Sequence, residues 1–596
     1  MKDKGSEIST PRWQRVVLTL FIGVLPAFGI VLLIRHLGSK ALLLDEWGLP
    51  NFFRKLKDGE LLLDIVWSGN HEHRLVFPRL FYGLVAVATR WDPRVVMNCS
   101  VVVVAISWAA FLFGFSKQFD LEGKRSIPVI GLCSLILFGP AQYENWLWAF
   151  QFAFFLILSC QLLGTALLMD QTQQVSTRFI GAAALSFIAS FSSAHGLFSW
   201  IALIPLILTF PGRTNRIRYV IIWSILAATT WVIYLRGLDL SKAGGLGVLL
   251  FHPVKVVRFG LLLIGNPFVG AVSGNIKIVL APLLGLVILI FAVAGPVLLT
   301  RRAGWQSAAP FFTLLLIGLI PWAAVSLGRL ADENATIALG SKYVTLVLPI
   351  VLTAILAFYG LQAEDKHAGS RQGGDRTDSG SSFPRIARRL LDALCALLFI
   401  GYLWNFPRSI ELAASESQRR KIADQFNMFS ECLDQRIDGS LSPTPESQLF
   451  GVNLWGLNDK GGMRELAQGG YRPLIRDPVF LEDSQNVEGT IAEVKQSPTR
   501  AAGVFALEVS GVCMLHSMDA IAPFIFITNS GESKIIGASH IDHLNRSATK
   551  EFLWNVAVPK SLCRNADHKI DLSGWVYDRV KGAFCLVGRR NFPEAP

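Results

Sequence analysis

Long, nearly uninterrupted apolar runs dominate the first two-thirds of the chain, from Val16 to about Phe406. A helix that crosses a membrane needs about 20 consecutive apolar residues, and runs near this length recur throughout the region. The pattern therefore predicts a polytopic membrane domain over residues 1–405. The expected spans lie near 16–35, 95–116, 127–140, 147–169, 178–193, 196–211, 219–236, 276–300, 310–327, 343–362 and 389–405.

Two further apolar segments, near 75–90 and 256–272, mix charged side chains with apolar and aromatic ones. Arg79 lies in the first, and Lys255 and Arg258 lie in or beside the second. Such composition is typical of interfacial or re-entrant helices. The sequence thus predicts an α-helical multi-pass membrane protein of about 11–13 transmembrane helices, with eleven if neither segment crosses.

Short basic stretches between the apolar runs indicate the orientation, because cytoplasmic loops are enriched in Lys and Arg. Five stretches agree on one side if the two interfacial segments do not cross. We therefore expect a cytoplasmic N-terminus, with loop 36–94 and the tail beyond 406 outside. The stretches are Lys2, Lys4, Arg12 and Arg15; Lys117, Lys124 and Arg125; Arg213, Arg216 and Arg218; Arg301 and Arg302; and the flexible loop 364–389.

Composition agrees with a membrane protein. The 596 residues are 52% hydrophobic and only 17% charged, against about 25% charged in soluble proteins. The net charge of +12 comes with basic residues in short loops between spans, so we predict membrane lipids as partners and no nucleic acid.

The tail has an ordinary soluble composition. Residues 406–488 are expected to form a helical and irregular connector, with a helix over Glu411–Cys432. Short β-rich runs over 489–596 predict an extracytoplasmic β-sandwich-like domain. Trp554, Trp575 and Tyr577 could bind glycan there, although filling the core is the preferred interpretation. The expected strands are 490–494, 503–509, 523–528, 534–537, 552–556 and 583–587.

Two adjacent carboxylates, Asp45 and Glu46, follow the first span in loop 36–94. Charges close to hydrocarbon are costly and tend to mark functional sites, so both are candidate catalytic residues. The alternative is that Asp45 caps the following helix.

A second polar cluster in this loop is His71-Glu72-His73-Arg74. Imidazole and guanidinium groups suit a phosphate or carboxylate ligand, and a hydrogen-bonded interfacial belt is the alternative. We predict no metal here, because no third histidine is nearby and the HExxH pattern is absent.

Later loops add polar groups that are expected on the same outer face. Each alone would be a solvated or snorkelling residue, but together they predict a polar mouth that would suit an anionic lipid headgroup and its cargo. They are Glu144, Asn145, Gln151, His195, Lys255, Arg258, Arg329, Lys342 and Tyr343.

The first helix, the long outer loop with Asp45-Glu46, an interfacial helix, the bundle of about 11–13 spans and an outer C-terminal domain together resemble the GT-C class of integral membrane glycosyltransferases. The resemblance covers residues 1–405 as architecture. It implies a polyprenyl-phosphate-linked sugar donor, a glycan, lipid or protein acceptor in the cell envelope, and a location in the bacterial inner membrane.

By the same resemblance, Asp45 would be the base that deprotonates the acceptor hydroxyl. The leaving phosphate would be stabilised by cations, for which Arg329, Lys342, Lys255 and Arg258 are candidates. Related enzymes tend to have Arg beside Tyr where this chain has Lys342. No cofactor is expected; the alternative is a divalent metal held by Asp45, Glu46 and Glu144, as in oligosaccharyltransferases.

Other functions remain open at the level of sequence. A flippase or transporter for a lipid-linked sugar, or a polysaccharide polymerase, would have a similar polar mouth. A transporter would usually show broken helices and polar residues near the midplane, whereas polar groups here are expected at one face. A non-catalytic scaffold would leave the dense first loop unexplained. An inverting glycosyltransferase is therefore the preferred hypothesis.

Overall fold

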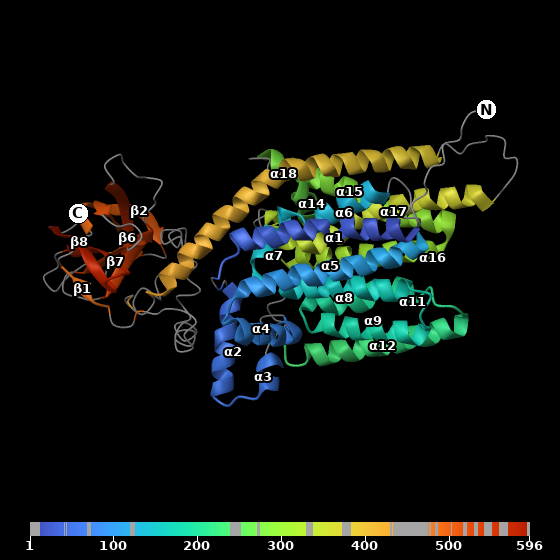
Figure 1. The fold of residues 1–596 in the computed structure, drawn as a ribbon, viewed down its shortest axis with the longest axis horizontal. Coiled ribbons are helices and arrows are strands. Elements are labelled where there is room, and N and C mark those ends of the chain that lie inside the picture. The colour runs from blue at the N-terminus through green and yellow to red at the C-terminus, as the bar shows by residue number, and fades with distance from the viewer. Residues whose placement is uncertain are drawn as a thin grey trace. The chain divides into compact units, whose positions relative to one another are not determined.

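The chain forms two compact units in the computed structural model (Figure 1). The first comprises Met1–Gly38 and Leu62–Ala414, and the second comprises Ser39–Leu61 and Ser415–Pro596. The structure describes residues 12–40, 42, 44–67, 73–119, 126–238, 252–270, 275–328, 338–371, 383–429, 432, 475, 478–482, 487–501, 504–515, 521–529, 534–540, 551–559 and 570–592.

The first unit is helical and fits an integral membrane protein. Among the described residues, nine helical segments are long and apolar enough to cross a membrane. Each coincides with a predicted span. The corresponding helices are α1 (Arg12–Leu37), α5 (Pro93–Gln118), α6 (Ser126–Leu137, extended by the short α7, Tyr143–Leu147), α8 (Phe152–Met169), α12 (Arg213–Leu235), α15 (Asn275–Ala303), α16 (Trp305–Gly328), α17 (Val344–Arg371) and α18 (Phe383–Asn427).

The two other predicted spans are shorter. Near 178–193 the structure has the 16-residue helix α9 (Val175–Ser190). Near 196–211 it has three short pieces, η4 (Ala194–Phe198), α10 (Ser199–Ala202) and α11 (Ile204–Ile207). The predicted interfacial segments are the short helices α4 (Val76–Thr89) and α14 (Pro253–Val269).

The bundle helices run along a shared direction (Figure 1), and α17 lies at its centre, with its apolar window entirely buried. Outer helices instead present large apolar side chains on their exposed faces. A water-soluble bundle would not tolerate so many exposed apolar side chains, whereas lipid tails would cover them. Examples are Phe21, Phe28, Ile106, Ile225, Leu283 and Ile400.

The two ends of the bundle differ. We call the end where α1 stops the Leu37 end. At the opposite end, Lys117 closes α5 and forms an ion pair of 3.0 Å with Asp170, just beyond α8. The basic residues that begin α12 also lie at this opposite end, because Arg216 donates to the Phe210 carbonyl oxygen and Phe210 packs on Arg178, beside the end of α8. Those that end α15 lie there too, because Phe311, near the start of α16, packs against Phe119, just beyond α5. This grouping agrees with the expected side of the basic loops.

Small residues allow α14 and α15 to pack backbone against backbone. A Cβ on Gly265 would collide with the carbonyl oxygen of Ala281, and a Cβ on Gly285 would collide with that of Leu261. The two contacts fix an antiparallel pair. Close approach at small residues is the usual basis of helix association in lipid.

The Gly265→Ala variant is therefore expected to lose about 1–3 kcal/mol of stability, because the two helices must separate to admit the methyl group. The matched control is Gly29→Ala in α1, where a Cβ would meet nothing within 4 Å and alanine should gain about 0.5–1 kcal/mol over glycine. Thermal unfolding in detergent measures both. Equal melting temperatures in the two variants would contradict the packing.

The second unit contains two sheets. One has the order β1-β8-β7-β4-β5, and the other has the order β2-β3-β6. All the described pairs are antiparallel except β1 with β8. The strands are β1 (Phe480–Leu481), β2 (Val487–Ala501), β3 (Val504–Leu515), β4 (Ile521–Asn529), β5 (Ile535–His540), β6 (Glu551–Pro559), β7 (Ile570–Asp578) and β8 (Ala583–Phe592).

Buried side chains from both sheets form one apolar cluster that includes Trp554. A second cluster on the other face of the five-stranded sheet contains Phe429, Trp575 and Tyr577. The indole nitrogen of Trp575 donates to Thr528 Oγ1 at 2.8 Å. Trp554, Trp575 and Tyr577 are thus buried in the core, which is the interpretation that the sequence analysis preferred over glycan binding.

The predicted boundary at residue 405 falls inside a helix. The last span and the predicted helix over Glu411–Cys432 are one continuous 45-residue helix, α18, which carries the chain from one compact unit into the other. Residues 39–61, which we expected in the membrane domain, group with the C-terminal unit.

Candidate functional site

Asp45 and Glu46 lie in a single 3-10 turn, η1 (Leu44–Trp47), directly before helix α2 (Gly48–Lys57). They face different surroundings. Asp45 is exposed, whereas Glu46 is 1% exposed. Of the two candidate carboxylates, Asp45 is therefore the one that an external substrate can reach.

Arg74 ties the end of the first loop to the end of α12. Its guanidinium donates to the carbonyl oxygens of Tyr234 (2.6 Å), Trp67 (2.5 Å) and Arg236. The side chain is buried and lies 4.5 Å from the ring centre of Trp67. Burial lowers the pKa of Arg74 from its ordinary value. Arginine nevertheless keeps its charge in proteins. Main-chain carbonyls thus accept hydrogen bonds from all three nitrogens of the guanidinium group that we expected to bind phosphate.

His73 and His195 come together although they are 122 positions apart. Their ring centres are 5.9 Å apart, and Ser193 Oγ lies 3.4 Å from Nδ1 of His73 and 3.5 Å from Nδ1 of His195. The Ala194 N–H also donates to Nδ1 of His73, at 3.4 Å. The sequence predicted both histidines but not the serine that links them.

A second polar group joins α7 to the start of α17. Glu144 Oε2 accepts the main-chain N–H of Lys342 at 2.8 Å, and the Glu144 N–H donates to Ser341 Oγ at 2.9 Å. The Asn145 amide donates to Thr345 Oγ1 at 2.6 Å, and the Thr345 hydroxyl donates to Gln142 Oε1. The predicted residues on these two segments therefore form one hydrogen-bonded cluster.

The Lys342 ammonium is the half-buried cation of this cluster. It lies 5.2 Å from the ring centre of Tyr343, which is itself buried. Among the residues that the structure describes, no carboxylate forms an ion pair with it. The Glu144 carboxylate is held at the Lys342 main chain. Lys342 thus offers positive charge at the Leu37 end of the central helix.

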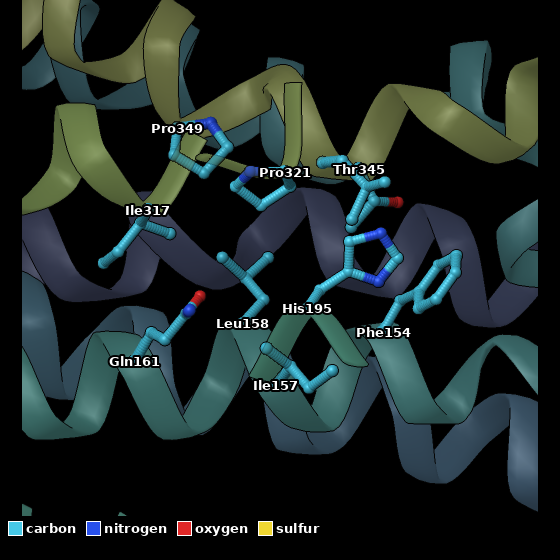
Figure 2. A pocket seen from close by; sticks show the side chains of 10 residues that line it. Phe154, Ile157, Leu158, Gln161, His195, Ile317, Pro321, Thr345 and Pro349 are labelled. Carbon is cyan, nitrogen blue, oxygen red and sulfur yellow. The ribbon is translucent and has the colours of Figure 1, made fainter. Parts of the chain in front are cut away.

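A small cavity adjoins this cluster at Thr345, between α8, η4, α16 and α17 (Figure 2). Its volume is about 20 Å³, enough for one water-sized group. Most of the lining is apolar, and its polar side chains are Gln161, His195 and Thr345. The sequence analysis missed Gln161, although a polar side chain inside a predicted span is itself a functional signal.

Of the other predicted residues, Lys255, Arg258 and Gln151 are described, and their side chains take no part in these hydrogen bonds. Lys255 and Arg258 are exposed on α14. Gln151 is buried, and its Oε1 has no hydrogen-bond partner among the described residues, as is true of Asn145 Oδ1. His71, Glu72 and Arg329 lie outside the described residues.

No set of three His, Cys, Asp or Glu side chains positioned to hold a metal ion occurs within the described part of the chain. Comparison with known proteins adds no identity: no protein-family model matches the chain, and no curated protein matches it. A functional proposal therefore rests on the geometry of the chain itself.

Proposed function

We propose that the protein is an integral membrane glycosyltransferase of GT-C-like architecture with a C-terminal β-sandwich domain. It would transfer a sugar from a polyprenyl-phosphate donor to an acceptor in the cell envelope, with inversion at the sugar carbon. The Leu37 end of the bundle and the C-terminal unit would face away from the cytoplasm, across the bacterial inner membrane.

The observation that carries the proposal is the Lys342 ammonium. A membrane-delivered phosphate needs a cation at the level where headgroups meet the hydrocarbon, and an ammonium without an ion-pair partner among the described residues can provide one. Glu144 and Ser341 hold the main chain around Lys342, so the side chain starts from a fixed position. A charge-assisted hydrogen bond from this ammonium would stabilise the departing phosphate oxygen.

Asp45 supplies the second requirement, a base for the acceptor hydroxyl. Its carboxylate is exposed in the turn η1. The base would take the acceptor proton as the new glycosidic bond forms and the bond to phosphate breaks.

The Lys342→Gln variant is expected to bind a polyprenyl phosphate about 10- to 100-fold more weakly, which corresponds to the loss of one charge-assisted hydrogen bond. Lys342→Arg should keep binding within a few-fold, because the charge is retained. Equilibrium binding in detergent measures both. Lys117→Gln, which removes a lysine at the opposite end of the bundle, is the control. Unchanged affinity in Lys342→Gln would contradict the proposed role of Lys342.

A lipid-linked-sugar flippase is the second candidate. Prolines inside α15, α16 and α17 favour it, because each proline removes a helical hydrogen bond and lets a helix bend, as transporter helices do. Such a protein would move the donor without breaking its bond to phosphate, and the two functions therefore differ in whether the donor is consumed.

A further inference from the structure

Two helix prolines line the cavity together with the residues four positions earlier, whose carbonyls lose their α-helical donor. In α16 the lining includes Pro321 and Ile317, and in α17 it includes Pro349 and Thr345. Proline has no N–H, so the carbonyl four residues earlier loses its α-helical partner. The carbonyl oxygens of Ile317 and Thr345 are the two affected. Two helices thus lack a main-chain hydrogen bond beside the same cavity.

The polar side chains of the wall also leave acceptors rather than donors. Gln161 directs its amide N–H to Ser199 Oγ at 3.0 Å, so its carbonyl oxygen is left for another partner. The Thr345 hydroxyl donates to Gln142 and accepts from Asn145, which leaves one lone pair on its oxygen. Figure 2 shows the α8 side chains, including Gln161, on one side of the cavity and the two prolines on the other. His195 completes the polar lining with an imidazole that can accept or donate.

We infer that this cavity binds a hydroxyl group of a carbohydrate, which donates its hydrogen to these acceptors. The carbohydrate class rests on the proposed function. A carbonyl without its helical donor in an apolar interior favours a ligand that donates a hydrogen bond. The small volume selects a single hydroxyl group. Among the described residues, none that lines the cavity is a carboxylate, which favours an uncharged ligand over a cation.

The binding test uses the purified full-length protein in detergent and a panel of methyl hexosides and pentosides. With about 100 mM of a fitting glycoside, we expect the melting temperature to rise by about 1–3 °C. Pro321→Ala supplies the N–H that Ile317 lacks, and Gln161→Leu removes an acceptor. Both variants should lose the shift. Pro310→Ala, in the same helix but outside the lining, should keep it.

Three results would overturn the inference. The first is that no glycoside raises the melting temperature, and the second is that Pro321→Ala and Gln161→Leu show the same rise as the parent protein. The third is that sodium chloride, compared with choline chloride, raises the melting temperature while the glycosides do not. Without any rise, a water molecule alone would fill the cavity. An equal rise in the variants would show a general solvent effect, and a rise with sodium chloride would show a cation site. The test needs no turnover. If the protein bound glycosides but transferred no sugar, the proposed transferase function would fail, while the inference about the cavity would stand.

Discussion

The Asp45→Asn variant is expected to transfer sugar about 10²–10⁴-fold more slowly than the parent protein, because general base catalysis contributes a factor of that size. Asparagine keeps the shape of the side chain but cannot accept the proton of the acceptor hydroxyl. Since Asp45 is exposed, the change should leave the fold intact. The initial rate at saturating donor measures the effect.

The matched control is Asp64→Asn, which removes another exposed carboxylate of the same loop, in helix α3 (Leu62–Trp67). It should transfer sugar at the parental rate. If Asp45→Asn also kept that rate while folding and inserting normally, Asp45 would not be the base. A loss of similar size in both variants would point to the net charge of the loop instead.

The Arg74→Met variant is expected to lose about 3–5 kcal/mol of stability, because three carbonyl oxygens of the loop and of the α12 end lose their donor. Each buried polar group left without a partner costs about 1–3 kcal/mol. Arg74→Lys should recover only part of the loss, since one ammonium cannot match the planar fork of the guanidinium. Thermal unfolding in detergent measures the series.

Arg90→Met serves as the control, because Arg90 is exposed at the end of α4. It should melt within a degree or two of the parent protein. If Arg74→Met melted like the parent but bound polyprenyl phosphate more weakly, Arg74 would be a phosphate ligand, as the sequence suggested, rather than a structural link.

The apolar runs predicted the membrane helices well, because length and hydropathy are local properties. The predicted spans near 178–193 and 196–211 are the exceptions: the first is the 16-residue helix α9, which ends at Ser190, and the second consists of short pieces. In the tail, the six predicted strands coincide with β2, β3, β4, β5, β6 and β8. The two-residue strand β1 and the longer strand β7 were missed. Strand β7 is buried on both faces between β4 and β8, and its second half, from Gly574 to Tyr577, does not alternate between apolar and polar residues.

The site was predictable residue by residue but not as an arrangement. Glu144 and Asn145 contact Ser341, Lys342 and Thr345 almost 200 positions away. The local sequence of neither segment predicts this contact. The role of Arg74 was likewise hidden, because its partners are main-chain carbonyls, which every residue carries. The cavity depends on where two prolines fall in neighbouring helices, and only the packing reveals that they share it.

The most direct measurement gives the purified protein, in detergent without a sealed membrane, a panel of polyprenyl-phosphate-linked sugars and cell-envelope material as acceptor. Release of polyprenyl phosphate is followed with time, alongside the Asp45→Asn variant. A glycosyltransferase is predicted to consume one of the donors in an acceptor-dependent way, and the variant should not. Donors that remain intact with the folded parent protein, while sealed vesicles containing it move the same donors across the bilayer, would contradict the proposed transfer and identify a flippase.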